Sequence, residues 1–297
     1  VPLSNVSVAY RSTLQIADKV LPVIPVKKEA DKYFTFGKEN FMLVDTLRGD
    51  GAPSKRARYT VSTGTYSVNY HALSDVVTDR MVENADAPLR PLINATNFLT
   101  DLIGIRKEYE VSNMLFDTTT FSGYTAAVGT QWDNASANPI ADIRTAKQTI
   151  VQNIGQEGNT VVMGRQVWDK LIDHPDILDR IKYSQKGVIS EDLIASIFGV
   201  DRILVGSLPY NVAALGRADS MTYLWGKFVL VCYVSPAPSI DSPSLGYILT
   251  KSTNGLTSIA RRWREEPLQG DVVEVEIAFV PKVTAADAGY LYSSVVA

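Results

Sequence analysis

The sequence predicts an α+β fold, in which β-rich segments and one long helix surround a central part where helices and strands alternate. Apolar residues recur at three- and four-residue spacing across 92–109, which is the pattern of a helix with one apolar face. Residues 57–70 and 273–279 instead alternate between apolar and polar side chains, as half-buried strands do. Residues 161–239 change repeatedly between the two patterns, which is typical of mixed helix and sheet.

Composition limits what such a chain can do. Its 297 residues, 45% hydrophobic and 21% charged, suffice for one large domain or two modest ones with a sizeable core. The formal net charge of −3 argues against a protein whose main task is to neutralise phosphates. The longest apolar run, 228–234, has seven residues, whereas a membrane-spanning helix needs about 20. No membrane partner is therefore expected.

The sequence contains little of the chemistry that an enzyme or a metal site needs. Cys232 lies in the apolar run and is expected to be a buried, inert thiol, and a lone cysteine fits folding in a reducing compartment. His71 and His174 match no zinc spacing; His174 precedes Pro175 and is expected to close a helix. Neither a phosphate-binding glycine loop nor a nucleophile elbow occurs. The prediction is no catalytic residue, no cofactor and no metal.

The first 72 residues predict two extended parts. Residues 1–30 contain three prolines among scattered apolar side chains. They fit either an ordinary disordered terminus or an extended arm, and the apolar Leu21, Val23 and Ile24 favour an arm that docks on another surface. Residues 31–72 predict two β-segments around a polar turn, with a bulge near Gly64, where the alternation changes. A two-stranded ribbon is not stable alone, so it requires either its own body or a neighbouring subunit.

Helices follow. The long helix is expected to begin at Pro88 or Pro91 and to end near Leu115, a rod of about 35–42 Å at 1.5 Å per residue. After a polar loop at 117–138, a second helix spans 139–154 and stops before Gly155.

The central part is expected to hold buried strands at 160–163 and 202–205 and an apolar segment at 224–234. A short helix ends near His174, a turn follows at 182–187, and a helix at 190–198 stops at Gly199. Three prolines at 236–243 then indicate the exit from this part.

The C-terminal part predicts antiparallel strands. Asn254–Gly255 between the segments 247–253 and 256–263 indicates a type I′ hairpin. In the strand at 273–279, Glu274 and Glu276 face away from the apolar side chains, and Pro281 is expected to end it.

Two basic clusters follow turns, Lys55, Arg56 and Arg58 in one and Arg261, Arg262 and Arg264 in the other. They fit either solvent-exposed strand edges or salt bridges to acidic neighbours in a closed assembly. Aromatic side chains hardly interleave with them, which argues against a nucleic-acid groove.

Several stretches resemble the tailed-phage major capsid proteins, whose fold is typified by that of phage HK97. ADKVLPVIPV at 17–26, followed by DKY at 31–33, resembles the N-arm running into the E-loop. NADAPL at 84–89 resembles the lead into the spine helix, and HPDI at 174–177 through YS at 183–184, with FGVD at 198–201, resembles the axial domain.

The resemblance implies an HK97-like fold with an N-arm at 1–30, an E-loop at 31–72, an axial domain at 161–239 and a peripheral domain at 73–160 and 240–297. It also implies a major head protein that self-assembles into hexamers and pentamers, which form an icosahedral shell around double-stranded DNA without reading its sequence. A scaffolding protein, a portal and a decoration protein would be further partners. Assembly would take place in the host bacterial cytoplasm, and the product would be part of the virion.

Candidate intersubunit contacts come from the arm, the ribbon and the basic clusters: Leu21, Val23, Ile24, Phe36, Arg48, Lys55, Arg56, Arg58, Arg261, Arg262 and Arg264. Some members of the family cross-link Lys to Asn. Lys38 and Lys55 lie on the expected E-loop, but no matching Asn and acid can be identified, so this chemistry is not assigned.

Two alternatives remain at this point. An encapsulin-like nanocompartment shell shares the fold but encloses enzymes, and the enclosed material distinguishes it from a virus. An uncharacterised soluble α+β enzyme would instead be a small oligomer with a polar pocket.

Overall fold

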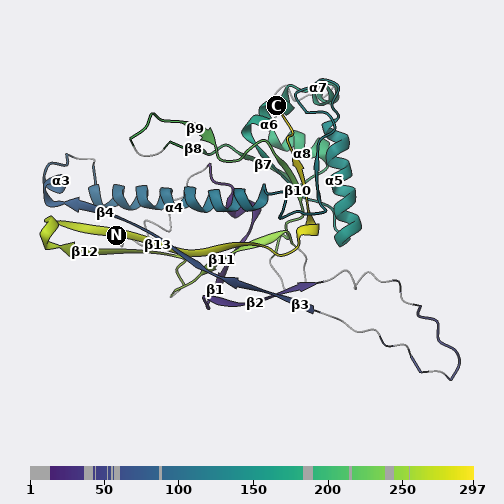
Figure 1. The fold of residues 1–297 in the computed structure, drawn as a ribbon, viewed down its shortest axis with the longest axis horizontal. Helices are drawn as coiled ribbons and strands as arrows, with labels where there is room; N and C mark the ends of the chain where they lie inside the picture. The colour runs from purple at the N-terminus through teal and green to yellow at the C-terminus, as the bar shows by residue number, and fades with distance from the viewer. Residues whose placement is uncertain are drawn as a thin grey trace.

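The structure is a computed structural model that describes residues 14–36, 43, 45–51, 53–54, 56, 61–86, 89–182, 190–213, 216–237, 244–253 and 255–297. The described part is elongated (Figure 1). A long helix lies along a sheet of long strands, a second sheet with its helices stands at one end, and a thin ribbon projects below that end. The mixture of helix and sheet confirms the predicted α+β class.

A five-stranded sheet forms the long part of the molecule. Its central strand, β13 (Gly270–Val283), pairs with β4 (Asn69–Thr78) along one edge. The other edge pairs first with β12 (Ser258–Glu265) and then with β11 (Gly246–Lys251). β1 (Val23–Val26) adds to β11 in parallel.

The hairpin predicted at Asn254–Gly255 is confirmed only at its turn, because the strands that flank the turn do not pair with each other. β11 and β12 follow one another along the same edge of β13, opposite 279–283 and 270–277. Between them the chain makes a small protrusion, in which Thr253 and Leu256 exchange two backbone hydrogen bonds of 3.0 Å. The turn signal is local, whereas the 14 residues of β13 offer both segments a longer pairing partner.

β13 has the predicted alternation. Val273, Val275 and Phe279 are buried, and Glu276 lies on the other side of the strand, where it pairs with Arg261. The strand does not end at Pro281 as predicted. Pro281 lies opposite Ile248 in β11. The Ile248 N–H points away from β13 and donates to the Pro22 carbonyl oxygen, on the side of β1. Pro281 and Ile248 therefore form a pair that exchanges no hydrogen bond. The missing N–H of Pro281 therefore costs the β11–β13 ladder nothing.

The long helix is α4 (Pro91–Leu115), and it begins at the second of the two predicted prolines. α3 (Asp79–Glu83) precedes it. Leu99 and Ile103 pack on Val273 and Val275 of the sheet. This contact fixes the helix along the strands, as Figure 1 shows.

The second sheet has the order β5 (Thr125–Ala127), β14 (Gly289–Ser293), β10 (Val229–Cys232), β6 (Thr160–Gly164) and β7 (Arg202–Gly206). Both segments predicted as peripheral contribute to it, β5 from the first and β14 from the second, beside three strands from 161–239.

Helices cover one face of this sheet. α5 (Pro139–Ile154), α6 (Arg165–Ile172) and α8 (Glu191–Phe198) pack on side chains such as Val161 and Val231. Successive strand residues point to opposite faces, so Val162 and Leu230 face the other way. There they meet the C-terminal end of α4 and the residues that precede β1. Cys232 is buried, as predicted, and desolvation raises the pKa of its thiol to about 12.

Gly155 and Gly199 end α5 and α8 as predicted, with φ of 69° and 64°. The side chains of Asn138 and Ser190, which were not predicted as caps, accept hydrogen bonds from N–H groups in the first turns of these helices. His174 follows the end of α6, as predicted, and its backbone N–H donates to the Leu171 carbonyl oxygen at 3.1 Å. Its Nδ1 accepts from the Asp176 N–H at 3.2 Å, so it caps the start of α7 (Pro175–Ile181), a helix that was not predicted.

Two small ribbons complete the fold. β2 (Ala30–Phe36) and β3 (Val61–Ser67) pair without interruption, so the bulge predicted near Gly64 is wrong. Gly64 lies opposite Tyr33, and a Cβ on Gly64 would stand 2.5 Å from the Tyr33 ring. The aromatic ring thus covers a strand glycine.

β8 (Pro209–Asn211) and β9 (Met221–Tyr223) form a hairpin that projects above α4 in Figure 1.

Among the described residues, none of the helices combines the length and the apolar character that crossing a lipid bilayer requires.

Candidate intersubunit surfaces

The arginines of β12 have partners within the chain. Arg261 Nη1 donates to Glu276 Oε2 at 2.8 Å and to Glu274 Oε1 at 3.0 Å. Arg262 pairs with Asp271. The carboxylates of Glu276, with the larger effect, and of Glu274 raise the pKa of the Arg261 guanidinium. These cross-strand ion pairs link β12 to β13 through their side chains, in addition to the backbone ladder.

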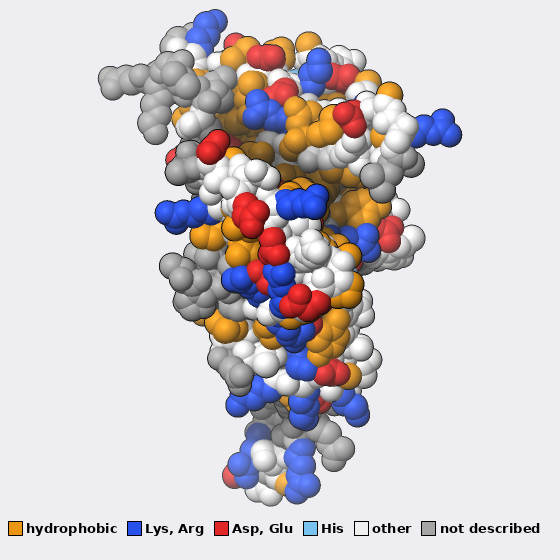
Figure 2. Space-filling view, turned by 90° about the vertical axis from the view of Figure 1, so that its left-hand side faces the viewer, with side chains coloured by type: hydrophobic (Ala, Val, Ile, Leu, Met, Phe, Trp, Pro, Cys, Tyr) orange, Lys and Arg blue, Asp and Glu red, His pale blue; other side chains and the backbone are white. Residues whose placement is uncertain are grey.

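Arg264 reaches further. Its Nη1 and Nη2 donate to the two carboxylate oxygens of Asp79 at 2.5 and 2.7 Å. This bidentate contact lowers the pKa of Asp79 and raises that of Arg264. It joins the end of β12 to the first turn of α3. Figure 2 views the molecule from this end and shows basic and acidic side chains interleaved over the middle of the face, with mostly basic side chains at its lower end.

The arm candidates differ in exposure. Leu21 is fully buried in the chain's own core, together with Val20. Ile24 is partly buried beside Tyr66 and Tyr247. Val23, 37% exposed, keeps apolar surface that a neighbour can cover.

The ribbon candidates are described only in part. Arg48 and Arg56 are exposed. Lys55 and Arg58 lie outside the described residues, as does the side chain of Phe36, whose backbone belongs to β2.

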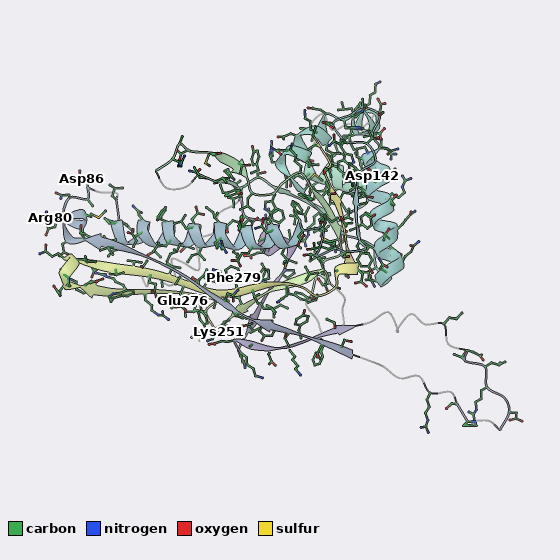
Figure 3. All side chains as sticks on the ribbon, in the orientation of Figure 1. Arg80, Asp86, Asp142, Lys251, Glu276 and Phe279 are labelled. Atoms are coloured by element: carbon green, nitrogen blue, oxygen red, sulfur yellow. The ribbon has the colours of Figure 1, made fainter. Side chains whose placement is uncertain are left out.

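The root of the ribbon is fixed by a polar contact that the sequence did not indicate. Lys251 Nζ donates to Glu29 and to the Tyr70 hydroxyl, which itself donates to Glu29 at 2.7 Å. The hydrogen bond to Glu29, which has the largest effect, and the one to Tyr70 raise the pKa of Lys251 to about 12. Figure 3 places Lys251 where the ribbon leaves the long sheet.

An apolar surface lies along α4 and the β8–β9 hairpin. Phe98 and Leu102 were predicted to share the buried stripe of the helix but are 58% and 37% exposed. They lie on the same helix face as Tyr109, whose ring meets Tyr210 at the base of the hairpin, 6.0 Å between centroids. The hairpin adds Met221, which is 62% exposed. We call Phe98, Leu102, Met221 and Tyr223 the spine–hairpin patch.

A buried carboxylate joins the arm to the body. Glu108 of α4 is fully buried. Its Oε1 accepts from the Ile16 N–H at 2.9 Å and from the Trp225 indole N–H at 2.8 Å, and its Oε2 accepts from the Ala17 N–H at 2.9 Å. Desolvation raises the pKa of Glu108, and the three N–H donors oppose that rise. We call these four residues the arm-root contact.

Sequence reasoning missed this contact because Glu108 lies in the run RKEYE at 106–110, which looks like a solvated helix face. The face is covered because α2 (Ala17–Val20) and Trp225 pack on it. Beside it, Lys107 and Asp18 form an ion pair of 2.8 Å, and Gln15 lies directly over Gly104.

Within the described ranges, no group of three His, Cys, Asp or Glu side chains is placed to hold a metal ion.

Comparisons with known proteins agree on one class. A family model described as Phage major capsid protein E matches residues 116–206. The major capsid protein of Burkholderia phage BcepMu is 29% identical over 303 residues, which cover 99% of this chain and 95% of the relative. The major capsid protein of Pseudomonas phage JBD67 is 27% identical over 239 residues, 78% of this chain and 75% of the relative.

Solved structures agree with this class. The crystal structure of a phage-related protein from Bordetella bronchiseptica RB50 has a TM-score of 0.79 at 27% identity, covering 99% of this chain and 96% of that one. The mature capsid of bacteriophage PhiM1 gives 0.57 at 14% identity, covering 96% and 87%. An encapsulin from Synechococcus elongatus PCC 7942 gives 0.56 at 13% identity, covering 99% and 95%. The last two show the fold alone.

The chain therefore has the HK97-like fold, and its resemblance to tailed-phage major capsid proteins is confirmed.

Proposed function

We propose that this chain, a phage major capsid protein by its relatives and its fold, self-assembles into hexamers and pentamers that form an icosahedral shell around double-stranded DNA. The observation that carries the proposal is the similarity to the BcepMu major capsid protein over 99% of this chain. The proposed role is structural rather than catalytic, and the same relatives support it.

The exposed surfaces support assembly. The spine–hairpin patch and Val23 present apolar side chains to solvent, and such surfaces on a folded subunit are typical of protein interfaces. The two-stranded β2–β3 ribbon also extends from the body (Figure 1), and a lone ribbon needs a partner. In the proposal, neighbouring copies supply these partners.

The finer assignments belong to the proposal too. Residues 1–30 act as the N-arm and 31–72 as the E-loop, with the axial domain in 161–239 and the peripheral domain in the two flanking segments. Of the basic candidates, Arg48 and Arg56 contact neighbouring subunits. Arg261, Arg262 and Arg264 already have acidic partners within the chain, so they act between subunits only if they share these partners.

Further partners follow from the same class: a scaffolding protein, a portal and a decoration protein. The net charge of −3 suits a shell that DNA enters and leaves, because the chain has no excess of basic residues to bind phosphates strongly. Assembly takes place in the host bacterial cytoplasm, and the product is part of the virion.

Electron microscopy of the purified protein at near-neutral pH tests the proposal. Uniform polyhedral particles, or rings of six and five subunits, are the expected result. A monomer or dimer by light scattering, without particles, would overturn the proposal and favour a soluble enzyme. Nuclease-protected DNA in particles from infected cells identifies a virus, whereas an enclosed enzyme identifies an encapsulin-like compartment.

A further inference from the structure

We propose that Glu108 is a positioning residue for assembly, which fixes the root of the N-terminal arm on the subunit and thereby sets where the arm leaves it. The inference rests on the proposed function for its assembly consequence, whereas the contact itself can be tested on the unassembled subunit.

The arm root has little structure of its own. α2 has four residues, and a helix that short is not stable in water by itself. Its burial therefore depends on the body. Ala17, Val20 and Leu21 are fully buried against Val111 and Leu115 of α4.

Apolar burial alone does not fix the register of the arm, because the hydrophobic effect is not directional. Hydrogen bonds are directional, and Glu108 supplies acceptors for two consecutive backbone N–H groups, those of Ile16 and Ala17. Sliding the arm by one residue would leave at least one buried donor or acceptor without its partner, which is costly in a core.

The third donor connects the arm root to the second sheet. Trp225 donates to the same carboxylate and packs its ring on Gly206, where a Cβ would stand 2.1 Å from the indole Cγ. Gly206 pairs with Gly164 at the ends of β7 and β6. Glu108 therefore joins three parts of the chain: the arm, the long helix and the helix-covered sheet.

The electrostatic surroundings of Glu108 favour this role. Three N–H groups donate hydrogen bonds to the Glu108 carboxylate. An ionised carboxylate only accepts hydrogen bonds, so the ionised form can satisfy all three donors. Of the charged side chains near it, Lys107 lowers its pKa, and Asp18 of α2 pairs with Lys107. A glutamine at 108 keeps the shape but turns an N–H₂ group toward these donors.

The test uses the full chain with Glu108→Gln. Hydrogen exchange of the peptide covering 14–21, measured on unassembled subunits, reports the arm root. Glu110→Gln is the matched control, because Glu110 lies on the same helix and pairs with Arg106 instead. Trp225→Phe, which removes one donor and keeps most of the ring, is the second variant if Glu108→Gln folds poorly.

We expect exchange at 14–21 to rise about tenfold or more in Glu108→Gln, as the loss of hydrogen bonds to a charged group predicts, and less in Trp225→Phe. The Trp225 indole N–H resonance should shift in Glu108→Gln and stay in place in Glu110→Gln. Unchanged exchange in both variants would overturn the inference.

Assembly is measured in parallel, by sedimentation and electron microscopy. If wild type forms shells, Glu108→Gln should form fewer or misshapen ones. Normal shells with a freed arm root would refute the assembly role. If wild type forms no shells although Glu108→Gln frees the arm root, the proposed function fails and the contact itself stands.

Discussion

Arg264 binds both carboxylate oxygens of Asp79, a residue 185 positions earlier in the chain. The contact links the turn that ends β12 to the start of α3, at the far end of the long sheet from the ribbon. Because both side chains are substantially exposed, it contributes more to the geometry of this end than to overall stability.

This ion pair has a definite pH dependence. Arg264 lowers the pKa of Asp79 from its usual 3.8. A lowered pKa in the folded state means that the contact contributes stability above the unfolded pKa and loses it as the pH falls through the folded pKa. We expect an NMR titration of the Asp79 carboxyl to have its midpoint below 3.8 in wild type and near 3.8 in Arg264→Ala. Arg261→Ala should leave the midpoint unchanged; an equal shift there would mean that general charge, not this contact, is responsible.

Gly206 should tolerate no side chain. Alanine there places a Cβ 2.1 Å from the Trp225 ring, in a core where overpacking costs roughly 1–3 kcal/mol. Gly206→Ala should therefore lower the melting temperature by several degrees. Gly129→Ala is the control, because a Cβ at Gly129 meets nothing within 4 Å. Equal melting temperatures for the two variants would contradict the packing described for Trp225.

The spine–hairpin patch should be needed for assembly and not for folding. Phe98→Asp combined with Leu102→Asp charges two exposed positions of α4, so the melting temperature should change little while shell formation, followed by light scattering, falls strongly. Val151→Asp, at a valine of α5 that is 38% exposed, is the control. Normal shells from the double variant would exclude the patch as an interface.

Two truncations should separate the arm from its root. Removing residues 1–13 leaves the arm-root contact intact, and the subunit should keep its unfolding free energy while it loses shells. Removing residues 1–30 also removes Val20 and Leu21, both fully buried, which costs roughly 3–6 kcal/mol of apolar burial. Chemical denaturation of both forms checks this; equal stability would show that the root contributes nothing to the core.

Local signals in the sequence predicted a good part of this fold. α4, α5 and α8 follow from apolar spacing together with proline or glycine at their ends, and β13 follows from its alternation. These features depend on residues close in sequence, so a linear pattern contains them.

The features that were missed depend on distant partners. β11 and β12 pair with β13 rather than with each other, because a longer strand is available. Gly64 indicated a bulge, but Tyr33 across the ribbon explains it. Glu108 lies in a charged run that resembles a solvated helix face, but the arm root buries it. The acidic partners of Arg261 and Arg264 likewise come from other strands and helices.

Pro281 has a consequence for subunits that accumulate at high concentration. In the described part of the chain, β4 pairs with β13 only as far as Phe279, so the same edge of β13 has no strand opposite Pro281. An uncovered strand edge invites an unrelated chain to extend the sheet. Proline offers such a chain no N–H donor on that side. We therefore expect Pro281 to hinder irregular aggregation of concentrated subunits through this edge.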